Sequence, residues 1–153
     1  MRKVEIFTDG SCLGNPGAGG WAAILRCDGI EKEISGGEGL TTNNRMELTA
    51  VIRAFGALKY PCAVDLYSDS RYVLDGIEKG WARKWKANGW MRNKREKALN
   101  ADLWEKLLQA LEPHQVTYHW VKGHDGHPEN ERCDSMAVAQ SKQFEQQKGF
   151  LGD

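Results

Sequence analysis

Four carboxylates stand at positions that a fold could bring together, and such a cluster would support metal-dependent chemistry. Asp9 and Asp69 each follow a short strand-like apolar pattern. Glu47 lies near the start of one helical pattern, and Asp134 lies in the second turn of the last one. Carboxylates at close range repel and raise one another's pKa unless a cation offsets their charge. A hard divalent metal is the simplest remedy, which makes phosphate chemistry the first hypothesis.

Each acid also has a purely structural explanation when it is considered alone. Asp9 precedes a glycine, and Asp-Gly pairs favour turns. Glu47 stands three residues after Asn44, which is the spacing of a capping box. Asp69 is a candidate N-cap, and Asp134 a candidate solvated helix position. Only a fold that brings all four together favours the functional hypothesis.

The order of the strand and helix patterns predicts how the acids are placed. Strand patterns cover residues 4–8, 21–27, 30–35, 64–68 and 116–121, and helical patterns cover 45–58, 70–79, 100–111 and a segment from Pro128. Asp28-Gly29 is a two-residue hairpin signal, and residues 36–42 are expected to form a loop. This order predicts an α/β fold, with a mixed sheet and helices packed on its faces. Adjacent parallel strands would place Asp9 and Asp69 at the edge where open α/β sheets bind ligands.

Length and composition indicate one globular domain. The chain has 153 residues, 41% apolar and 27% charged, with zero net charge. We expect a catalytic domain at residues 1–141 and a polar, mobile tail at 142–153. No apolar run is long enough to cross a bilayer, and strand alternation starts at once, leaving no room for a signal peptide. Four cysteines without a C-x-x-C pair suit isolated thiols in a reducing compartment, which predicts a cytoplasmic protein with no membrane partner.

The loop before the last helix carries two histidines. His124 and His127 lie in the glycine-punctuated residues 122–130. A histidine beside a metal pocket can shuttle protons near neutral pH, although both could also be plain surface residues. Zinc binding by these histidines with Cys133 is a weaker alternative, because a closed structural site needs a fourth ligand at suitable spacing.

Positive charge gathers in one segment of this neutral chain. Residues 79–97 include only one acid, Glu96, and eight basic residues. The basic residues are Lys79, Arg83, Lys84, Lys86, Arg92, Lys94, Arg95 and Lys97. Such patches attract phosphate backbones without reading their sequence. Trp81 and Trp85 form a helical stripe with Ile77, so we expect both to pack against a neighbouring helix rather than to stack on bases.

Several long motifs, in order from about residue 4 to 139, resemble the type 1 ribonuclease H family, specifically bacterial ribonuclease HI. They are Thr8-Asp9-Gly10-Ser11, Asn15-Pro16-Gly17, Thr42-Asn43-Asn44-Arg45-Met46-Glu47-Leu48, Ser68-Asp69-Ser70, Trp120-Val121-Lys122-Gly123-His124 and residues 126–134. The resemblance implies a five-stranded mixed sheet of order 3-2-1-4-5, with helices on both faces and a basic helical protrusion at about 80–97. It also implies a monomer that cleaves the RNA strand of RNA–DNA hybrids endonucleolytically, leaving 5′-phosphate and 3′-hydroxyl ends.

The resemblance assigns roles to individual residues. Asp9, Glu47, Asp69 and Asp134 would hold two Mg²⁺ ions when substrate is bound, with Mn²⁺ as a possible substitute, and His124 would carry protons. The substrate-binding positions that it implies are Gly10, Ser11, Cys12, Asn15, Thr42, Asn43, Asn44, Arg71, Arg83, Lys84, Lys86 and Asn100. Among them, Thr42 and Asn100 match the positions that form the family's pocket for a phosphate of the DNA strand.

Two residues depart from the family pattern. Arg71 stands where glutamine is common in the family. The arginine is expected either to make a charged contact in place of the glutamine contact or to shift the cleavage-site preference. Asp125 follows His124 where a small residue is usual, and a nearby carboxylate favours protonated histidine, so an altered pH–rate profile is expected. Two other functions stay open at this point: a hybrid-binding module without catalysis, and a DNA-cleaving nuclease of the same fold.

Overall fold

The protein is built on a five-stranded mixed sheet. The structure, a computed structural model, describes residues 1–122 and 127–150, and the side chains of 1–122 and 127–147. The strands are β1 (Arg2–Leu13), β2 (Gly17–Cys27), β3 (Ile30–Thr41), β4 (Cys62–Ser68) and β5 (Gln115–Trp120). Their order is β3-β2-β1-β4-β5, with β1, β2 and β3 antiparallel and β4 and β5 parallel to their neighbours. The predicted fold class and strand order are confirmed.

The glycine-rich segments form strand, whereas the sequence pattern predicts loops. β2 already begins at Gly17, and β3 runs on to Thr41, through residues 36–41 that are expected to form a loop. Gly20 of β2 pairs with Gly37 of β3. A Cβ atom at Gly20 would lie 2.1 Å from the carbonyl oxygen of Ala137 on the helix that crosses it. These glycines therefore permit close packing of a helix on the sheet, which a sequence pattern cannot distinguish from a turn.

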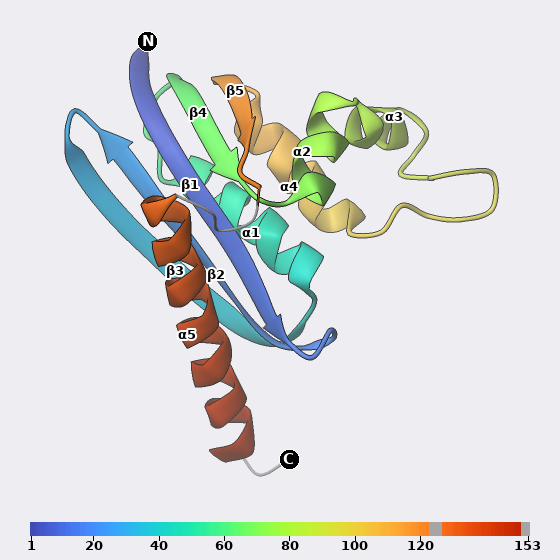
Figure 1. The fold of residues 1–153 in the computed structure, drawn as a ribbon. Coiled ribbons are helices and arrows are strands. Elements are labelled where there is room, and N and C mark those ends of the chain that lie inside the picture. Colours follow the sequence, from blue (N-terminus) through green and yellow to red (C-terminus); the bar gives the residue numbers. More distant parts are fainter. Residues whose placement is uncertain (123–126, 151–153) are drawn as a thin grey trace.

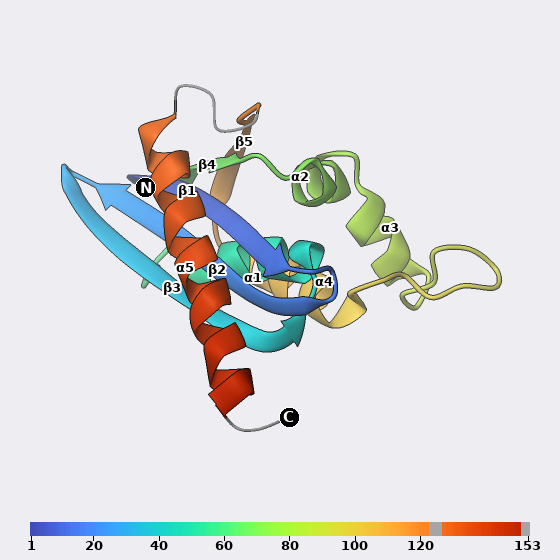
Figure 2. The same cartoon turned by 60° about the horizontal axis from the view of Figure 1, so that its bottom comes forward.

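The described residues contain five helices. They are α1 (Asn43–Gly56), α2 (Arg71–Glu78), α3 (Trp81–Ala87), α4 (Ala101–Leu111) and α5 (Pro128–Phe150). Figures 1 and 2 show α1 and α4 on one face of the sheet and α5 alone across the other. The larger core lies on the α1 face, where Ile6, Leu66 and Trp104 are fully buried. These layers bring the start of α1, the end of β4 and the first turns of α5 to one region.

The α5 face has a smaller core. Phe7, Ala22 and Ile24 of the sheet pack against Cys133 and Ala137 of α5. The Cys133 thiol donates a hydrogen bond to the carbonyl oxygen of Phe7 at 3.4 Å. Because Cys133 directly precedes Asp134, this contact fixes the part of α5 that carries the predicted acid.

α5 continues through Phe150 as one helix, beyond the predicted start of the tail at residue 142. The division of the chain at residue 141, and mobility beyond it, stay predictions. The four cysteines are free, as expected. Within the described ranges no helix has the length and apolar character to cross a membrane.

The basic segment projects away from the sheet. Figures 1 and 2 show α3 and residues 88–100 extending to one side of the molecule. Trp85 packs edge-on against Trp104 of α4, with ring centroids 6.2 Å apart, as predicted. The same prediction for Trp81 is wrong: α2 ends at Glu78, the left-handed Gly80 redirects the chain, and Trp81 is 42% exposed. The predicted stripe of Ile77, Trp81 and Trp85 assumed one helix, but Ile77 lies in α2 and the two tryptophans lie in α3.

Candidate active site

Asp9 and Asp69 meet where two parallel strands part. The pairing of β1 with β4 ends at Phe7, and β4 itself ends at Ser68. β1 continues alone beside β2, so Asp9 lies within a strand and not in a turn, which excludes the Asp-Gly turn explanation. Asp69 comes directly after β4 and therefore faces the same gap. Parting strands of this kind open a ligand site at a sheet edge.

A pocket of about 470 Å³ opens at this gap. Its lining includes ten of the predicted site residues: Asp9, Gly10, Ser11, Cys12, Asn43, Asn44, Glu47, Asp69, Arg71 and Asp134. The predicted residues thus converge from β1, α1, the β4–α2 connection, the start of α2, and α5. His124 and Asp125 lie outside the described residues.

One backbone amide holds two of the acids. The Gly10 N–H donates to Glu47 Oε1 at 3.0 Å and to Asp9 Oδ1 at 2.9 Å. The capping-box explanation for Glu47 is therefore wrong, because Thr42 is the N-cap of α1 and its hydroxyl accepts the Arg45 N–H. Since the Gly10 amide is engaged by carboxylates, its predicted contact with substrate would have to compete with them.

Gly10 permits this arrangement because it has no side chain. A Cβ atom at Gly10 would lie 2.5 Å from the Glu47 nitrogen and 2.7 Å from the Met46 carbonyl carbon. The backbones of β1 and α1 are therefore in direct contact at the pocket. Any other residue at position 10 must push α1, and Glu47 with it, away from Asp9.

Gly10→Ala is expected to lower the stability by about 2 kcal/mol, within the range for overpacking a rigid site, and to reduce kcat. Urea unfolding, and the rate of cleavage of the expected RNA–DNA hybrid substrate, measure the two effects. Gly39→Ala is the matched control, since a Cβ atom at Gly39 meets nothing within 4 Å. If both alanine variants behave alike, the close approach at Gly10 does not set the geometry of Glu47.

The remaining two acids are also placed by their elements. Ser70, and not Asp69, caps α2, because the Ser70 hydroxyl accepts the Val73 N–H at 3.2 Å. The N-cap explanation considered above for Asp69 is therefore wrong. Asp134 is half-buried on α5 and lines the pocket, so it is not a solvated helix position.

The cluster strongly perturbs its own titration. Burial, and then the charges of Asp69 and Asp134, raise the pKa of Asp9 to about 8. Burial and the charges of Asp9 and Asp69 hold the pKa of Glu47 well above its usual range. Asp9 therefore keeps a proton at neutral pH unless a cation replaces it, and the same causes disfavour the charged form of the neighbouring Glu47. Perturbed carboxyl groups lining a pocket are typical of functional sites.

The chemistry of this donor set fits a hard divalent cation. Oxygens of Asp9, Glu47 and Asp69 lie within 4.8 Å of one another. Among the described residues, no hydrogen-bond donor reaches Asp9 Oδ2 or Glu47 Oε2, although both oxygens are buried. A cation coordinated by these oxygens would supply the missing partner. The zinc alternative is wrong for Cys133, whose buried thiol has its pKa raised to about 12 and bonds to Phe7.

The comparison with known families places this site in context. The sequence model described as RNase H matches residues 1–142. The chain belongs to the ribonuclease H family. This confirms the predicted resemblance and the predicted enzyme class, an endoribonuclease for RNA–DNA hybrids.

Curated relatives and solved structures agree with the family. "Ribonuclease H" of Nitratidesulfovibrio vulgaris (strain DSM 19637 / Miyazaki F) is 60% identical over 141 residues, covering 92% of this chain and 90% of the relative. "Ribonuclease HI" of Brucella melitensis is 57% identical, covering 94% and 93%. The crystal structure of LC9-RNase H1 is 35% identical with a TM-score of 0.82, covering 93% of this chain and 73% of that one. LC11-RNase H1, solved in complex with an RNA/DNA hybrid, has a TM-score of 0.67 at 19% identity, covering 92% and 97%, and shares the fold.

The predicted substrate residues of this ribonuclease H fall into three groups: residues at the pocket, cations on α3, and the pair Thr42 and Asn100. Asn43 and Asn44 are exposed at the start of α1, beside the acids. Asn15 supports them, because its side-chain oxygen accepts the Asn43 N–H at 3.0 Å. The second group is the exposed cationic set Arg83, Lys84 and Lys86 on α3. Lys86 also pairs with Glu105 of α4 at 3.4 Å.

Thr42 and Asn100 are linked through Arg45, which the sequence interpretation left unassigned. Arg45 donates to Asn100 Oδ1 at 3.2 Å and forms a bidentate pair with Asp102 at 3.0 and 2.7 Å. The Asn100 amide also donates to the Tyr72 hydroxyl. Asn100, predicted to begin a helix, adopts a left-handed backbone just before α4. The signal in the sequence that could have indicated a role for Arg45 is its place inside the motif from Thr42 to Leu48.

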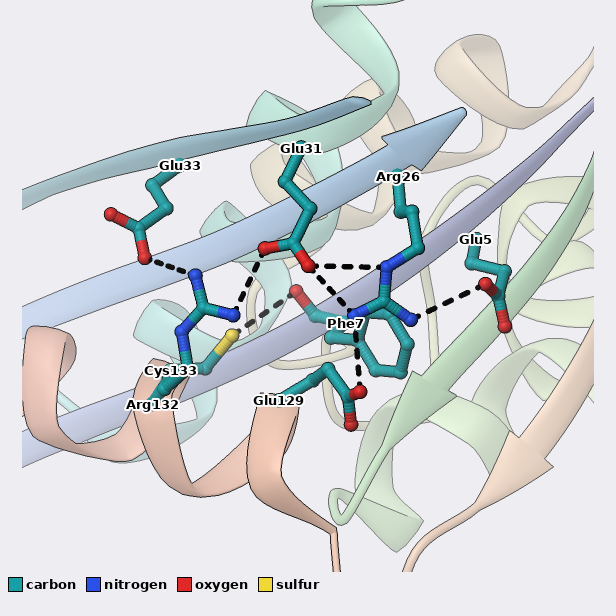
Figure 3. Close-up of polar contacts among 8 residues, drawn as sticks. All are labelled: Glu5, Phe7, Arg26, Glu31, Glu33, Glu129, Arg132 and Cys133. Atoms are coloured by element: carbon teal, nitrogen blue, oxygen red, sulfur yellow. Dashed lines mark hydrogen bonds and ion pairs between the residues drawn. The ribbon is translucent and has the colours of Figure 1, made fainter. Parts of the chain in front are cut away.

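An ion network fastens the start of α5 to the sheet on the side of Phe7 (Figure 3). Arg26 of β2 contacts Glu31 Oε1 at 2.9 Å and Glu129 Oε1 at 3.0 Å, and its guanidinium carbon lies 5.3 Å from the Phe7 ring centroid. Arg132 of α5 pairs with Glu31 and with Glu33 at 2.9 and 2.6 Å. Because Glu129 and Arg132 flank the turn that leads to Asp134, the network helps to hold that acid in place.

Arg26→Met is expected to lower the melting temperature, because Glu31 and Glu129 lose the cation between them. Salt screens the resulting repulsion, so the loss should be smaller in 1 M NaCl than in 0.05 M NaCl. Thermal melts at both ionic strengths measure this difference. Lys32→Met, in the same hairpin, is the control for removing one exposed cation. Equal losses at both salt concentrations would contradict the electrostatic explanation.

Proposed function

We propose that Asp9, Glu47, Asp69 and Asp134 form the catalytic site at which this ribonuclease H hydrolyses the RNA strand, leaving 5′-phosphate and 3′-hydroxyl ends. The observation that carries the proposal is a group of three carboxylates, two buried and one half-buried, whose oxygens lie within 4.8 Å of one another. Asp9 and Glu47 each bury an oxygen that has no hydrogen-bond partner among the described residues, a costly arrangement that a bound cation would offset. Mg²⁺ is the proposed ion, two per site with substrate, and Mn²⁺ is a substitute.

When bound, two such ions would activate the attacking water and stabilise the departing 3′ oxygen. The chain's own groups supply the remaining functions. The Gly10 amide aligns Asp9 with Glu47, and the end of β4 presents Asp69 beside them. α5, held by Cys133 and the Arg26 network, presents Asp134. His124 is proposed to carry protons for the reaction.

Recognition of the hybrid is proposed to use three groups of substrate residues: those at the pocket, the pair Thr42 and Asn100, and the exposed cations of α3. Ser11, Cys12, Asn43 and Asn44 line the pocket. They are proposed to contact the RNA strand, whose 2′-hydroxyl distinguishes it from DNA. Thr42 and Asn100, joined through Arg45, are proposed to receive a phosphate of the DNA strand. A chain of the same fold, LC11-RNase H1, binds an RNA/DNA hybrid in its solved structure.

One assay tests the proposal. Labelled RNA–DNA hybrid, double-stranded DNA and double-stranded RNA are each incubated with the full chain, with Mg²⁺ or with EDTA. The expected result is loss of the RNA strand of the hybrid alone, in Mg²⁺ alone, with 5′-phosphate product ends. Cleavage of double-stranded DNA would favour the DNA nuclease, and undiminished cleavage in EDTA would overturn the role of the acids.

Neutralising the exposed cations of α3 with Arg83→Gln, Lys84→Gln and Lys86→Gln is expected to raise KM about ten-fold at 0.15 M salt, with kcat little changed. The reason is that phosphate contacts contribute to hybrid binding but not to the reacting atoms. The slope of log KM against log salt should also become shallower, by up to about 0.9 for each lost contact.

The matched control for this variant replaces three exposed lysines elsewhere, Lys3, Lys32 and Lys59, with glutamine. It removes the same charge from the sheet and from the end of α1. If both triple variants shift KM equally, net charge alone explains the effect, and α3 has no special part in binding.

A further inference from the structure

Trp120, the last residue of β5, touches both ends of the segment from Asp69 to Arg71. Its indole N–H donates to the Asp69 carbonyl oxygen at 3.3 Å. The Arg71 guanidinium carbon lies 4.6 Å from the centroid of its ring. Trp120 pairs in register with Ser68, so the end of the β4–β5 ladder delivers the ring to this place. The ring is 46% exposed, and packing into the core therefore does not account for it.

Arg71 occupies an unusual place for a cation. It lines the same pocket as Asp9, Glu47, Asp69 and Asp134. A flexible guanidinium two residues from Asp69 is attracted to these carboxylates, and it would compete there with a metal ion. Within the described ranges, the carboxylate that pairs with Arg71 is instead Asp75 on the next turn of α2, at 3.5 Å. The Trp120 ring offers the guanidinium a second partner away from the acids.

We propose that Trp120 is a positioning residue that keeps Arg71 at the rim of the acidic pocket. The indole face holds the guanidinium outside the carboxylate cluster, so that the acids stay available to cations. The same placement directs the Arg71 charge toward the phosphates of an incoming hybrid. This inference rests on the proposed function, because it assumes that the acids bind metal. It assigns a role to a residue that carries no chemistry of its own.

Mn²⁺ titration of the substrate-free full chain by calorimetry tests the inference. Trp120→Leu removes the ring, and it is expected to weaken Mn²⁺ affinity about three-fold or more, on the scale of one exposed cation–π contact. Trp120→Phe keeps a ring face and loses the N–H, so its affinity should stay within about two-fold of wild type. In an Arg71→Gln background, Trp120→Leu should leave the affinity unchanged, because no guanidinium remains to enter the cluster.

Two results would overturn the inference. One is an equal loss of Mn²⁺ affinity from Trp120→Leu with and without Arg71, and the other is a loss in Trp120→Phe as large as in Trp120→Leu. Trp120→Gln replaces the leucine variant if the latter does not fold by circular dichroism. Failure of the proposed function looks different: wild type would bind no Mn²⁺, or Asp69→Asn would bind it as tightly as wild type.

Discussion

Asp9→Asn is expected to lower kcat by at least about a thousand-fold, which corresponds to ~4 kcal/mol of lost transition-state stabilisation. Asparagine has nearly the same shape as aspartate, but it lacks the negative charge that a divalent cation requires from this buried position. The hybrid contacts of α3 and of the α1 start are untouched, so the Kd for hybrid should change less than three-fold. Single-turnover cleavage and hybrid-binding titrations in Mg²⁺ separate the two quantities.

Asp28→Asn is the matched control for the activity measurement. It makes the same change of side chain in the β2–β3 turn, at the opposite end of the sheet. Asp28 has a φ of 52°, and asparagine tolerates this conformation, so the turn should persist. Full activity in Asp28→Asn with none in Asp9→Asn would assign the loss to the pocket. Substantial turnover by Asp9→Asn would support a hybrid-binding module, or a catalytic site elsewhere.

Much of the fold follows from local sequence patterns. The hairpin at Asp28-Gly29 forms as predicted, with both residues at positive φ. Alternation in residues 64–68 gives β4 and therefore the place of Asp69. The meeting of Asp9 with Asp69 needed one further assumption, that β1 and β4 are parallel neighbours, and the structure confirms it. The convergence of the acids could thus be predicted as a hypothesis from the order of the elements.

Other features depend on contacts between distant segments, and local patterns do not encode them. Gly20 allows α5 to pack closely on the sheet, but a glycine-rich segment in the sequence is equally typical of a turn. Glu47 fits a capping box by spacing, yet its carboxylate is taken by the Gly10 amide, 37 positions earlier in the chain. Arg45 and Trp120 gain their roles from partners on other elements. For these residues, the sequence alone supplies the type of side chain but not its partner.

Asp9→Asn should also make the metal-free protein more stable, by at least about 1 kcal/mol or ~3 °C in Tm at pH 8. The folded pKa of Asp9 is raised to about 8, first by burial and then by its acidic neighbours. The unfolded carboxyl group has its ordinary pKa of 3.8. Between these values the folded chain binds the extra proton, so wild-type stability falls as pH rises from about 4 to 8. Asparagine does not titrate, and it carries no negative charge to repel the neighbouring carboxylates.

The difference in Tm between Asp9→Asn and wild type should therefore be small at pH 4, grow to pH 8 and then level off. Thermal melts in EDTA across this range measure it, with Asp28→Asn as the control for the same substitution outside the pocket. Adding Mg²⁺ at pH 8 should shrink the difference, because the cation binds and stabilises wild type preferentially. A constant difference, or a variant that melts below wild type at pH 8, would contradict the strained cluster. If Asp9→Asn loses turnover and also gains stability in the metal-free protein, the acids lower the folding stability while they provide the cation site needed for catalysis.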